Sequence, residues 1–186
     1  APPAEGLLAV RLPLPPGCFP TLWQDDQGFL DSYLTTYPGY YATGDGGYVD
    51  MDGYVFVMGR VDDVINVAGH RLSTGRMEEV IAGHPDVAEC AVVGIADELK
   101  GQVPMGLVVP KASIIKDPDE LVDEVRLMVR EQIGAVASFR KALVVTRLPK
   151  TRSGKILRRC ISKIADGEPF VVPSTIDDPA VLDELR

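Results

Sequence analysis

One segment of the chain is apolar almost without interruption, and it limits how the rest can fold. Between Val87 and Ile95 the only charged residue is Glu89. A short run of this kind, rich in β-branched residues, is typical of a strand buried on both faces. The segment Val103–Val109 has the same character. We therefore predict that these two strands pair inside the core.

Strand and helix patterns alternate on both sides of this pair. The alternation from residue 62 to residue 164 predicts a compact α+β domain with a three-stranded sheet, helices and a two-stranded hairpin. Gly69 can close the hairpin, and Ser73 or Thr74 can cap the helix that follows it. The expected elements are strands at 64–67, 70–72, 87–95, 103–109 and 142–145, and helical segments from Ser73 or Thr74 to near Pro85, over 119–133 and over 156–164.

The upstream part of the chain is predicted to be rich in β-strands. Residues 7–12 are strand-like, and two further strands at 47–50 and 54–58 are joined by the turn Asp50–Gly53. An Asp-x-Asp-Gly sequence between alternating apolar residues is a good hairpin signal. Aromatic residues recur between Phe29 and Tyr41. The chain enters a strand without an initial methionine, so we expect a fragment.

The composition argues against several classes of function. With 186 residues, 46% of them hydrophobic, the chain is long enough for one good core or two small ones. The net charge of -8 argues against general binding to nucleic acids or anionic membranes. Cys18, Cys90 and Cys160 suggest neither a disulfide framework nor a metal knuckle, because they are few and far apart. No apolar run reaches the length of a membrane span, and we expect the cytoplasm or, in a eukaryote, the mitochondrial matrix.

One region of this acidic chain is strongly basic. Nine Lys and Arg residues and no acidic residue lie between Arg140 and Lys163. Within it, the turn in Pro149–Ile156 is predicted to place Lys155 where a helix begins, and backbone N–H groups at a helix start favour an anion. A solvated basic face would have the same composition. The segment is not a Walker A loop, because Gly-x-x-x-x-Gly-Lys-Ser/Thr is absent.

Three segments together resemble a known family. Tyr41–Asp45, Gly59–Arg71 and Pro149–Ile156 are similar, in this order and spacing, to the last three core motifs of the adenylate-forming (AMP-binding) superfamily. The surrounding sequences, Val61–Leu72 and Leu148–Lys155 among them, look like the acetyl/propionyl-CoA synthetase branch. Any one motif is weak evidence, and three in order are strong.

The two ends of the chain, Val10–Gly17 and Ser174–Pro179, favour the propionyl-type members. The resemblance implies that residues 1–61 are the end of the large N-terminal AMP-binding domain, in its β-rich part, and that residues 62–186 are the mobile C-terminal domain. The family's upstream phosphate loop and acyl pocket are not in this sequence. Acetate and propionate therefore both stay open as substrates, and we expect the fragment alone to be inactive.

The resemblance implies an acid–thiol ligase that uses ATP, CoA and Mg²⁺. Such enzymes convert a small carboxylic acid to an acyl-adenylate and pyrophosphate, and then pass the acyl group to CoA. Asp45 would accept hydrogen bonds from the ribose hydroxyls of ATP, with Arg60 at the same ribose. Arg71 would meet the phosphates through its guanidinium fork. Without a ligand, Asp45 would be a turn residue and Arg60 a charge at a strand end.

Lys155 is the catalytic residue that the resemblance implies. Its ammonium would bridge the substrate carboxylate and the α-phosphate, where negative charge builds as the two groups approach. In relatives the same lysine is acetylated as an off-switch, because acetylation removes this charge. A protein acetyltransferase and a deacetylase are therefore expected partners.

For the second half-reaction the family turns its C-terminal domain about a hinge. Asp62 matches that hinge, with Asp63 as a rival on sequence alone. Gly69 falls where the pantetheine arm of CoA passes and a side chain would not fit; Ala68 would offer its backbone to CoA. Arg130 matches a contact to the 3′-phosphate. Without these roles, Asp62 would be an exposed turn residue, Gly69 a hairpin glycine and Arg130 a charge that complements a helix C-terminus.

One histidine is a candidate metal ligand. His84 matches a cation site that relatives form from this imidazole and the carbonyls near Ala82 and Val87. A histidine in front of a proline is more often a residue at the end of a helix, and that interpretation stays open.

Two other functions share these motifs. An adenylation domain that loads a carrier protein has them without the acetyl/propionyl-type connecting sequence, and an assay of the thiol acceptor separates it from a CoA ligase. A non-catalytic regulatory module keeps the same fold. Such a module need not retain Asp45, Arg60, Gly69 and Lys155 together, which counts against it.

Overall fold

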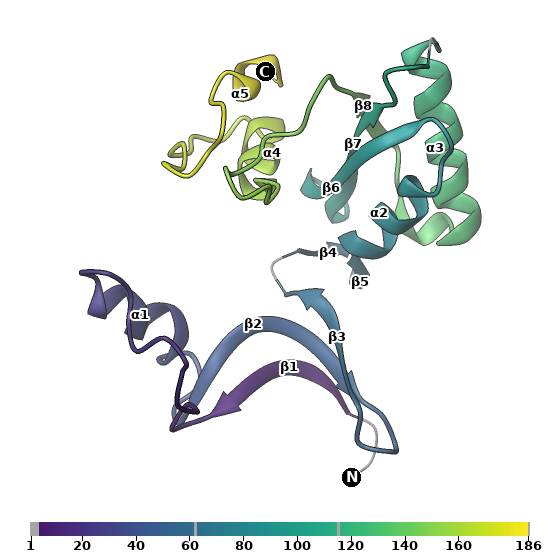
Figure 1. The fold of residues 1–186 in the computed structure, drawn as a ribbon. Helices are drawn as coiled ribbons and strands as arrows, with labels where there is room; N and C mark the ends of the chain where they lie inside the picture. Colours follow the sequence, from purple (N-terminus) through teal and green to yellow (C-terminus); the bar gives the residue numbers. More distant parts are fainter. Residues whose placement is uncertain (1–3, 62, 115, 186) are drawn as a thin grey trace. The chain divides into compact units, whose positions relative to one another are not determined.

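The computed structural model describes residues 4–61, 63–114 and 116–185, which form two compact units (Figure 1). The first unit covers residues 1–62 and the second residues 63–186. The assignment of these units to two domains of a larger enzyme stays a prediction. Among the described residues, no helix combines the length and the hydropathy needed to cross a bilayer.

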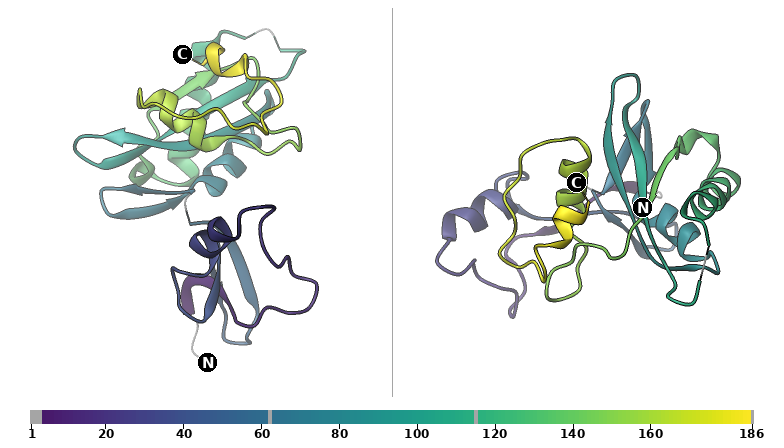
Figure 2. Two further views of the ribbon diagram at one scale, coloured as in Figure 1. Left: turned by 90° about the vertical axis from the view of Figure 1, so that its left-hand side faces the viewer. Right: turned by 90° about the horizontal axis from the view of Figure 1, so that it is seen from above.

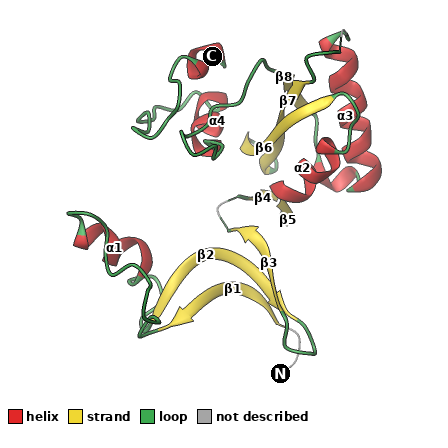
Figure 3. Ribbon diagram, in the orientation of Figure 1, coloured by secondary structure: helices red, strands yellow, loops and turns green. Residues whose placement is uncertain are grey.

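The first unit is built on a three-stranded antiparallel sheet with β2 in the middle (Figure 3). β2 is much longer than the strand expected at 47–50. Its glycines conceal this, because Gly44 has a φ of 76° and the register of β2 and β3 shifts between Gly46 and Gly47. Bulged, glycine-rich strands lose the alternation of apolar and polar residues that marks a strand in the sequence. The strands are β1 (Ala4–Arg11), β2 (Tyr40–Val49) and β3 (Val55–Arg60).

A helix that the sequence pattern did not predict, α1 (Asp26–Tyr33), lies between β1 and β2 in the chain. The Asp25 side chain caps it by accepting a hydrogen bond from a backbone N–H of the first turn at 2.9 Å. Phe29 and Tyr33 lie one turn apart, and the Tyr33 ring stacks on Tyr41 with 5.1 Å between centroids. The recurring aromatic residues are therefore the contact between this helix and β2.

The second unit contains a five-stranded sheet of order β5-β4-β7-β6, with β8 paired in parallel to β7. β6 and β7 pair antiparallel along their whole length, and the β4–β5 hairpin joins the sheet through the pair Val67–Gly101. The expected sheet and hairpin are both present, and the α+β class is confirmed. The strands are β4 (Val64–Val67), β5 (His70–Ser73), β6 (Val87–Asp97), β7 (Gly101–Pro110) and β8 (Lys141–Val144).

Helices cover both faces of this sheet (Figures 1 and 2). Along β6 the side chains alternate: Val92 belongs to the core with α2 and α3, whereas Ala91 and Val93 belong to the core that includes Ile161 of α4. This explains why the segment is apolar at nearly every position, since both faces are buried. The helices are α2 (Thr74–Ala82), α3 (Pro118–Gln132) and α4 (Arg158–Ala165), with two short helices η1 (Ala135–Ala137) and α5 (Val181–Glu184).

The start of α4 differs from the sequence expectation. The apolar pattern begins at Ile156, but that residue forms an extended bridge with Lys150, and α4 begins at Arg158. Lys155 therefore stands in a turn before the helix and not at its N-terminus. The starts of α1, α2 and α3 follow capping rules: before α2, the Ser73 hydroxyl accepts a hydrogen bond from the Arg76 N–H at 3.3 Å.

Gly106 of β7 lies against the ring of Phe139, which is 8% exposed. A Cβ at residue 106 would stand 2.5 Å from Phe139 Cζ. We expect Gly106→Ala to lower the free energy of unfolding by about 1–3 kcal/mol in urea denaturation, because the core is overpacked. Starting from Phe139→Leu, the same change should cost less. Equal costs in the two backgrounds would contradict this contact.

Candidate functional site

The Lys155 loop is a short hairpin that depends on Thr151. Lys150 and Ile156 form an antiparallel bridge at its base. The Thr151 N–H donates to the Lys155 carbonyl at 2.8 Å, and the Lys155 N–H donates to the Thr151 hydroxyl at 3.1 Å. Gly154, with a φ of 84°, completes the turn, and its N–H donates to the Thr151 carbonyl at 2.8 Å. The backbone of Lys155 is therefore fixed on both sides, while the residue is exposed.

Ion pairs neutralise several of the basic residues around this loop. Lys150 Nζ lies 2.6 Å from the Glu89 carboxylate of β6, and the Arg158 guanidinium contacts both Glu78 oxygens at 2.9 and 2.8 Å. In the described part of the chain, no residue forms an ion pair with Lys155. Its ammonium is therefore available to an anion. The other paired cations of the basic region are Arg147 and Lys163.

The turn between β4 and β5 consists of Ala68 and Gly69, with φ values of 49° and 88°. Positive φ at both central residues is the pattern of a type I′ turn, for which Asn-Gly is preferred. An alanine in this conformation costs roughly 1–2 kcal/mol, and such strain is concentrated at functional sites. Apart from its chain neighbours, no described atom lies within 4 Å of the place of a Cβ on Gly69. The backbone is open on this side.

The Ala68–Gly69 turn is also attached to the sheet by a backbone hydrogen bond of Ala68. The Ala68 N–H donates to the Lys100 carbonyl, in the turn between β6 and β7, at 2.9 Å. Any backbone contact of Ala68 to CoA therefore falls to its carbonyl.

The Lys155 loop and the Ala68–Gly69 turn lie at opposite ends of the β6–β7 pair. The loop is joined by an ion pair to Glu89, near the start of β6, whereas the turn contacts Lys100, just beyond Asp97 at its end. From Glu89 to Asp97 the strand advances roughly 27 Å, at about 3.4 Å per residue. One small reacting centre therefore cannot meet both turns in a single placement of this unit.

The two predicted phosphate ligands of the second unit are exposed arginines. Arg71 stands on β5 opposite Asn66 of β4, two residues after Gly69. Arg130 lies in the last turn of α3, where its charge also complements the helix C-terminus. Neither forms an ion pair within the described residues, and their ligand roles stay predictions.

Within the first unit, the structure brings Asp45 and Arg60 together. They pair across β2 and β3, and Arg60 Nη1 lies 3.7 Å from Asp45 Oδ1 and donates to the Thr43 carbonyl at 2.9 Å. Gly44 between Thr43 and Asp45 has a φ of 76°, which favours glycine, and a Cβ there would also displace this guanidinium. A carboxylate beside a guanidinium suits a ribose diol, which needs acceptors and donors. Ribose binding stays a prediction.

His84 lies in a cluster that contains its own cation. The ring is 6% exposed, its Nδ1 accepts the Asp86 N–H at 3.2 Å, and its Nε2 lies 3.1 Å from Glu124 Oε2. Lys116 Nζ lies 2.8 Å from the Asp86 carboxylate and 2.6 Å from that of Glu124. Both ring nitrogens therefore have partners, and the two carboxylates share an ammonium.

A metal ion held by this imidazole would have to compete with the partners that the ring already has. The ligand atoms of His84, Asp86 and Glu124 lie within 4.8 Å of one another, but a metal ion would have to displace a hydrogen bond of the ring. Ala82 ends α2 and Val87 begins β6, on either side of the histidine. The cation site stays a prediction, and no step proposed below depends on it.

The sequence did not predict the contacts that Thr151, Glu89 and Lys116 make in the structure. Glu89 had a signal, because a lone charge in an apolar run needs a partner of opposite charge. Thr151 and Lys116 gave none, since each acts through partners that only the fold supplies. The expected hinge, Asp62, lies outside the described residues.

Comparison with known proteins identifies part of the chain. Residues 76–155 match the model of the AMP-binding enzyme C-terminal domain. This stretch is similar to that family over 80 of the 186 residues. The match runs from α2 to Lys155, so it reaches the third of the three motifs, and the relatives described next extend over nearly the whole chain.

The C-terminal domain and its flanks are similar to short-chain acyl-CoA synthetases. The chain is 61% identical over 182 residues to an uncharacterised protein of Pseudomonas aeruginosa, and 51% over 181 residues to the human mitochondrial acyl-CoA synthetase short-chain family member 3. It is 49% identical over 187 residues to the propionate–CoA ligase of Escherichia coli. These matches cover 97% or 98% of this chain but only 29%, 26% and 30% of the relatives. The chain is thus homologous to the C-terminal part of such enzymes.

A solved structure supports the fold. An anthranilate CoA ligase in complex with anthranoyl-AMP matches 78% of this chain and 28% of its own, with 32% identity and a TM-score of 0.66. The chain is therefore similar in fold to part of an adenylate-forming enzyme.

Lys116 is expected to control the acid stability of the C-terminal domain. Its hydrogen bonds lower the pKa of Asp86 below 3.8 and that of Glu124 below 4.5. A lowered pKa in the folded state stabilises the fold above the unfolded value and is lost as the pH falls through the folded one. We expect Lys116→Met to be less stable at pH 7, and to lose less stability between about pH 5 and pH 2, in urea unfolding at each pH. The exposed Lys141→Met is the control. An unchanged acid profile in Lys116→Met would contradict the assignment.

Proposed function

We propose that this chain is the C-terminal part of an ATP-dependent short-chain acyl-CoA synthetase, which converts propionate or acetate to the acyl-CoA with AMP and pyrophosphate as products. The observation that carries the proposal is the Lys155 loop. Its backbone is fixed by a hydrogen-bonded hairpin, while no described residue pairs with its ammonium. A lysine that is only a solvated charge needs no such turn. The propionate–CoA ligase among the relatives supports propionate.

In the first half-reaction Lys155 supplies positive charge. A carboxylate oxygen of the substrate attacks the α-phosphorus of ATP, and pyrophosphate leaves. An ammonium between these two anions offsets their repulsion as they approach. Asp45 and Arg60 hold the ribose, and Arg71 meets the phosphates. Mg²⁺ enters with ATP as its counter-ion.

In the second half-reaction the opposite end of the domain is used. The sulfur of CoA attacks the acyl carbon of the adenylate, and AMP leaves. The Ala68–Gly69 turn lies along the pantetheine arm, and Arg130 meets the 3′-phosphate. Because the strand between the two turns is roughly 27 Å long, the domain has to turn between the half-reactions, with Asp62 as the proposed hinge.

The exposed position of Lys155 also supports control by modification. A lysine in an exposed turn is accessible to a protein acetyltransferase and a deacetylase. Acetylation would remove the charge that adenylation requires. The proposed compartment is the cytoplasm or the mitochondrial matrix.

Lys155→Ala tests the adenylation role. The test uses a chimaera in which this chain replaces the homologous part of Escherichia coli propionate–CoA ligase, of which it covers 30%. We expect ATP–pyrophosphate exchange with propionate to fall by ~10²–10³, because no other cation replaces the ammonium. Conversion of preformed propionyl-adenylate to propionyl-CoA should continue.

The exposed lysine variant Lys141→Ala is the matched control and should leave both half-reactions unchanged. Equal loss of both half-reactions in folded Lys155→Ala would contradict the use of separate ends of the domain. Transfer of the acyl group to a carrier protein in place of CoA would favour the carrier-loading alternative.

Gly69→Leu should have the reverse effect in the same chimaera. Adenylate should form, whereas thioester synthesis should stop, because the leucine side chain fills the path of the pantetheine arm. Gly69→Ala is the matched variant, since it shares the strain of a positive φ but adds a single methyl group. We expect it to retain more thioester synthesis than Gly69→Leu. If Gly69→Leu kept full thioester synthesis, the glycine would serve the hairpin alone.

A further inference from the structure

The first arm of the Lys155 loop forms backbone contacts on both of its sides. On one side is the second arm of the loop itself. On the other side is the C-terminal segment, residues 173–185, which returns to the loop after α4. The contacts to the C-terminal segment are an antiparallel bridge between Thr151 and Ile176, a hydrogen bond from the Arg152 N–H to the Thr175 carbonyl at 3.0 Å and one from the Asp177 N–H to the Lys150 carbonyl at 2.9 Å.

An apolar core fastens the C-terminal segment to α4. Ile176, Val181 and Leu182 are 5%, 3% and 2% exposed, and they form a cluster with Cys160 of α4. α4 begins three residues after Lys155. The segment is therefore packed against the helix that follows the loop directly.

A charged contact fastens the same segment on the upstream side of the loop. Arg147 lies 2.6 Å from a carboxylate oxygen of Asp178 and 2.6 Å from one of Glu184. The Thr146 hydroxyl donates to Glu184 at 2.9 Å. Residues just before and just after the loop thus both hold the C-terminal segment.

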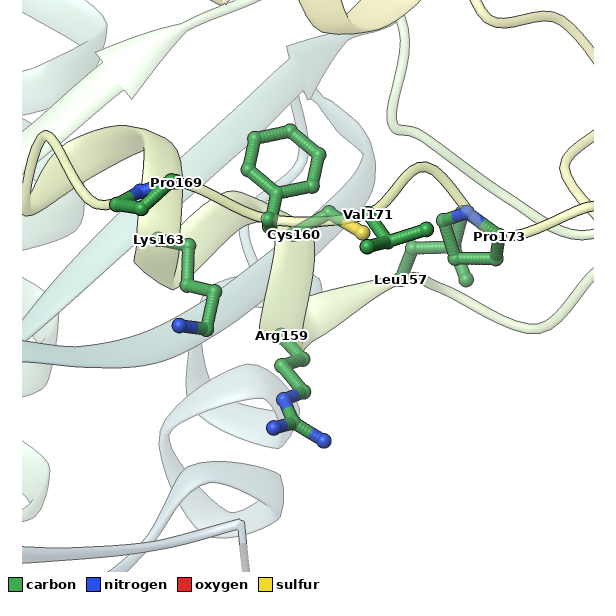
Figure 4. A pocket seen from close by; sticks show the side chains of 8 residues that line it. Leu157, Arg159, Cys160, Lys163, Pro169, Val171 and Pro173 are labelled. Carbon is green, nitrogen blue, oxygen red and sulfur yellow. The ribbon is translucent and has the colours of Figure 1, made fainter.

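The connection between α4 and the C-terminal segment contributes less to this hold. It borders a surface pocket of about 600 Å³ beside Cys160 and Lys163 (Figure 4). Val171, in this connection, is 90% exposed. The segment is therefore held mainly by its own contacts from Thr175 onward, and Phe170 of the connection packs against the same apolar cluster.

These contacts stabilise the loop beyond what its own two arms provide. A two-stranded hairpin alone is marginally stable in water, whereas a third strand with a buried side makes such a structure stable. The C-terminal segment gives the loop a third line of backbone contact, one bridge with its two hydrogen bonds, and Ile176 at this bridge is buried. A small displacement of a catalytic group is enough to cost rate, so the order of this loop bears on catalysis.

We propose that the C-terminal segment is a positioning element for Lys155, with Ile176 as its principal residue. Ile176 does not touch the reacting groups, and it acts by fixing the arm from which Lys155 is presented. The proposal rests on the proposed function, in which Lys155 serves adenylation but not thioester formation. Loss of the segment should therefore impair one half-reaction and spare the other.

Hydrogen–deuterium exchange on the 186-residue chain tests the structural half of the proposal without any assay of activity. We expect Ile176→Asp to speed exchange of the amides of residues 151–155 by on the order of tenfold or more, while β6 and β7 stay protected. Val171→Asp adds the same charge five residues upstream and should change nothing. Unchanged exchange of the loop in Ile176→Asp would overturn the proposal.

A second variant covers the case in which Ile176→Asp unfolds the whole unit. Asp178→Asn combined with Glu184→Gln removes the charged contact to Arg147 and leaves the apolar core in place. We expect faster exchange at residues 151–155 here too, with β6 and β7 unaffected. Normal exchange in this variant would overturn the proposal when Ile176→Asp has lost its fold.

Kinetics in the chimaera test the functional half. We expect Ile176→Asp to slow ATP–pyrophosphate exchange by on the order of tenfold or more and to leave conversion of propionyl-adenylate unchanged. The conservative variant Ile176→Val should keep the normal rate of exchange. Equal loss of both half-reactions would mean a structural role alone and would overturn the proposal. If Lys155→Ala is impaired but Ile176→Asp is not, the positioning role fails and the proposed function stands. If Lys155→Ala adenylates normally, the proposed function fails instead.

Discussion

The antiparallel pairing of β6 and β7 is the constraint on which the second unit depends. Its side chains point alternately into two separate cores, one with α2 and α3 and one with α4. Val92 and Ala91, neighbours on β6, are both 0% exposed although they face opposite ways. A strand buried on both faces must be apolar throughout, and covering helices on both sides are then required. The helices and the sheet specify each other.

The same pair of strands also separates the two candidate contacts with substrates. The Lys155 loop lies at one end and the Ala68–Gly69 turn at the other, so a rigid strand pair sets the distance between them. Both contacts stand on turns, where the backbone is free of the ladder and side chains can reach a ligand. Backbone strain is also found in one of these turns, because Ala68 has a positive φ at a position where asparagine or glycine is usual.

Some charged residues of the second unit form ion pairs that hold the fold together, and others are available to ligands. Glu78 of α2 pairs with Arg158 of α4 and also accepts the Val92 N–H of β6 at 2.8 Å, so one carboxylate joins three elements across the sheet edge. Lys116 plays a similar part between Asp86 and Glu124. Removing one member of such a partly buried network leaves an uncompensated charge and lowers the stability of the fold. Lys155, like Arg71 and Arg130, has no ion-pair partner among the residues that the structure describes, so its charge is available to a ligand.

The sequence alone determined the central strands, the long helix α3 and the family, because burial on both faces, a helical period and three ordered motifs are local signals. It did not reveal α1, whose stability comes from aromatic packing against β2, or the early start of β2, which glycines conceal. It placed Lys155 at a helix start, whereas a bridge between Lys150 and Ile156 delays the helix. The partners of Glu89, Lys116 and Thr151 are residues distant along the chain. Only the tertiary structure decides such contacts, because the sequence around a residue does not show which distant residues will lie next to it in the fold.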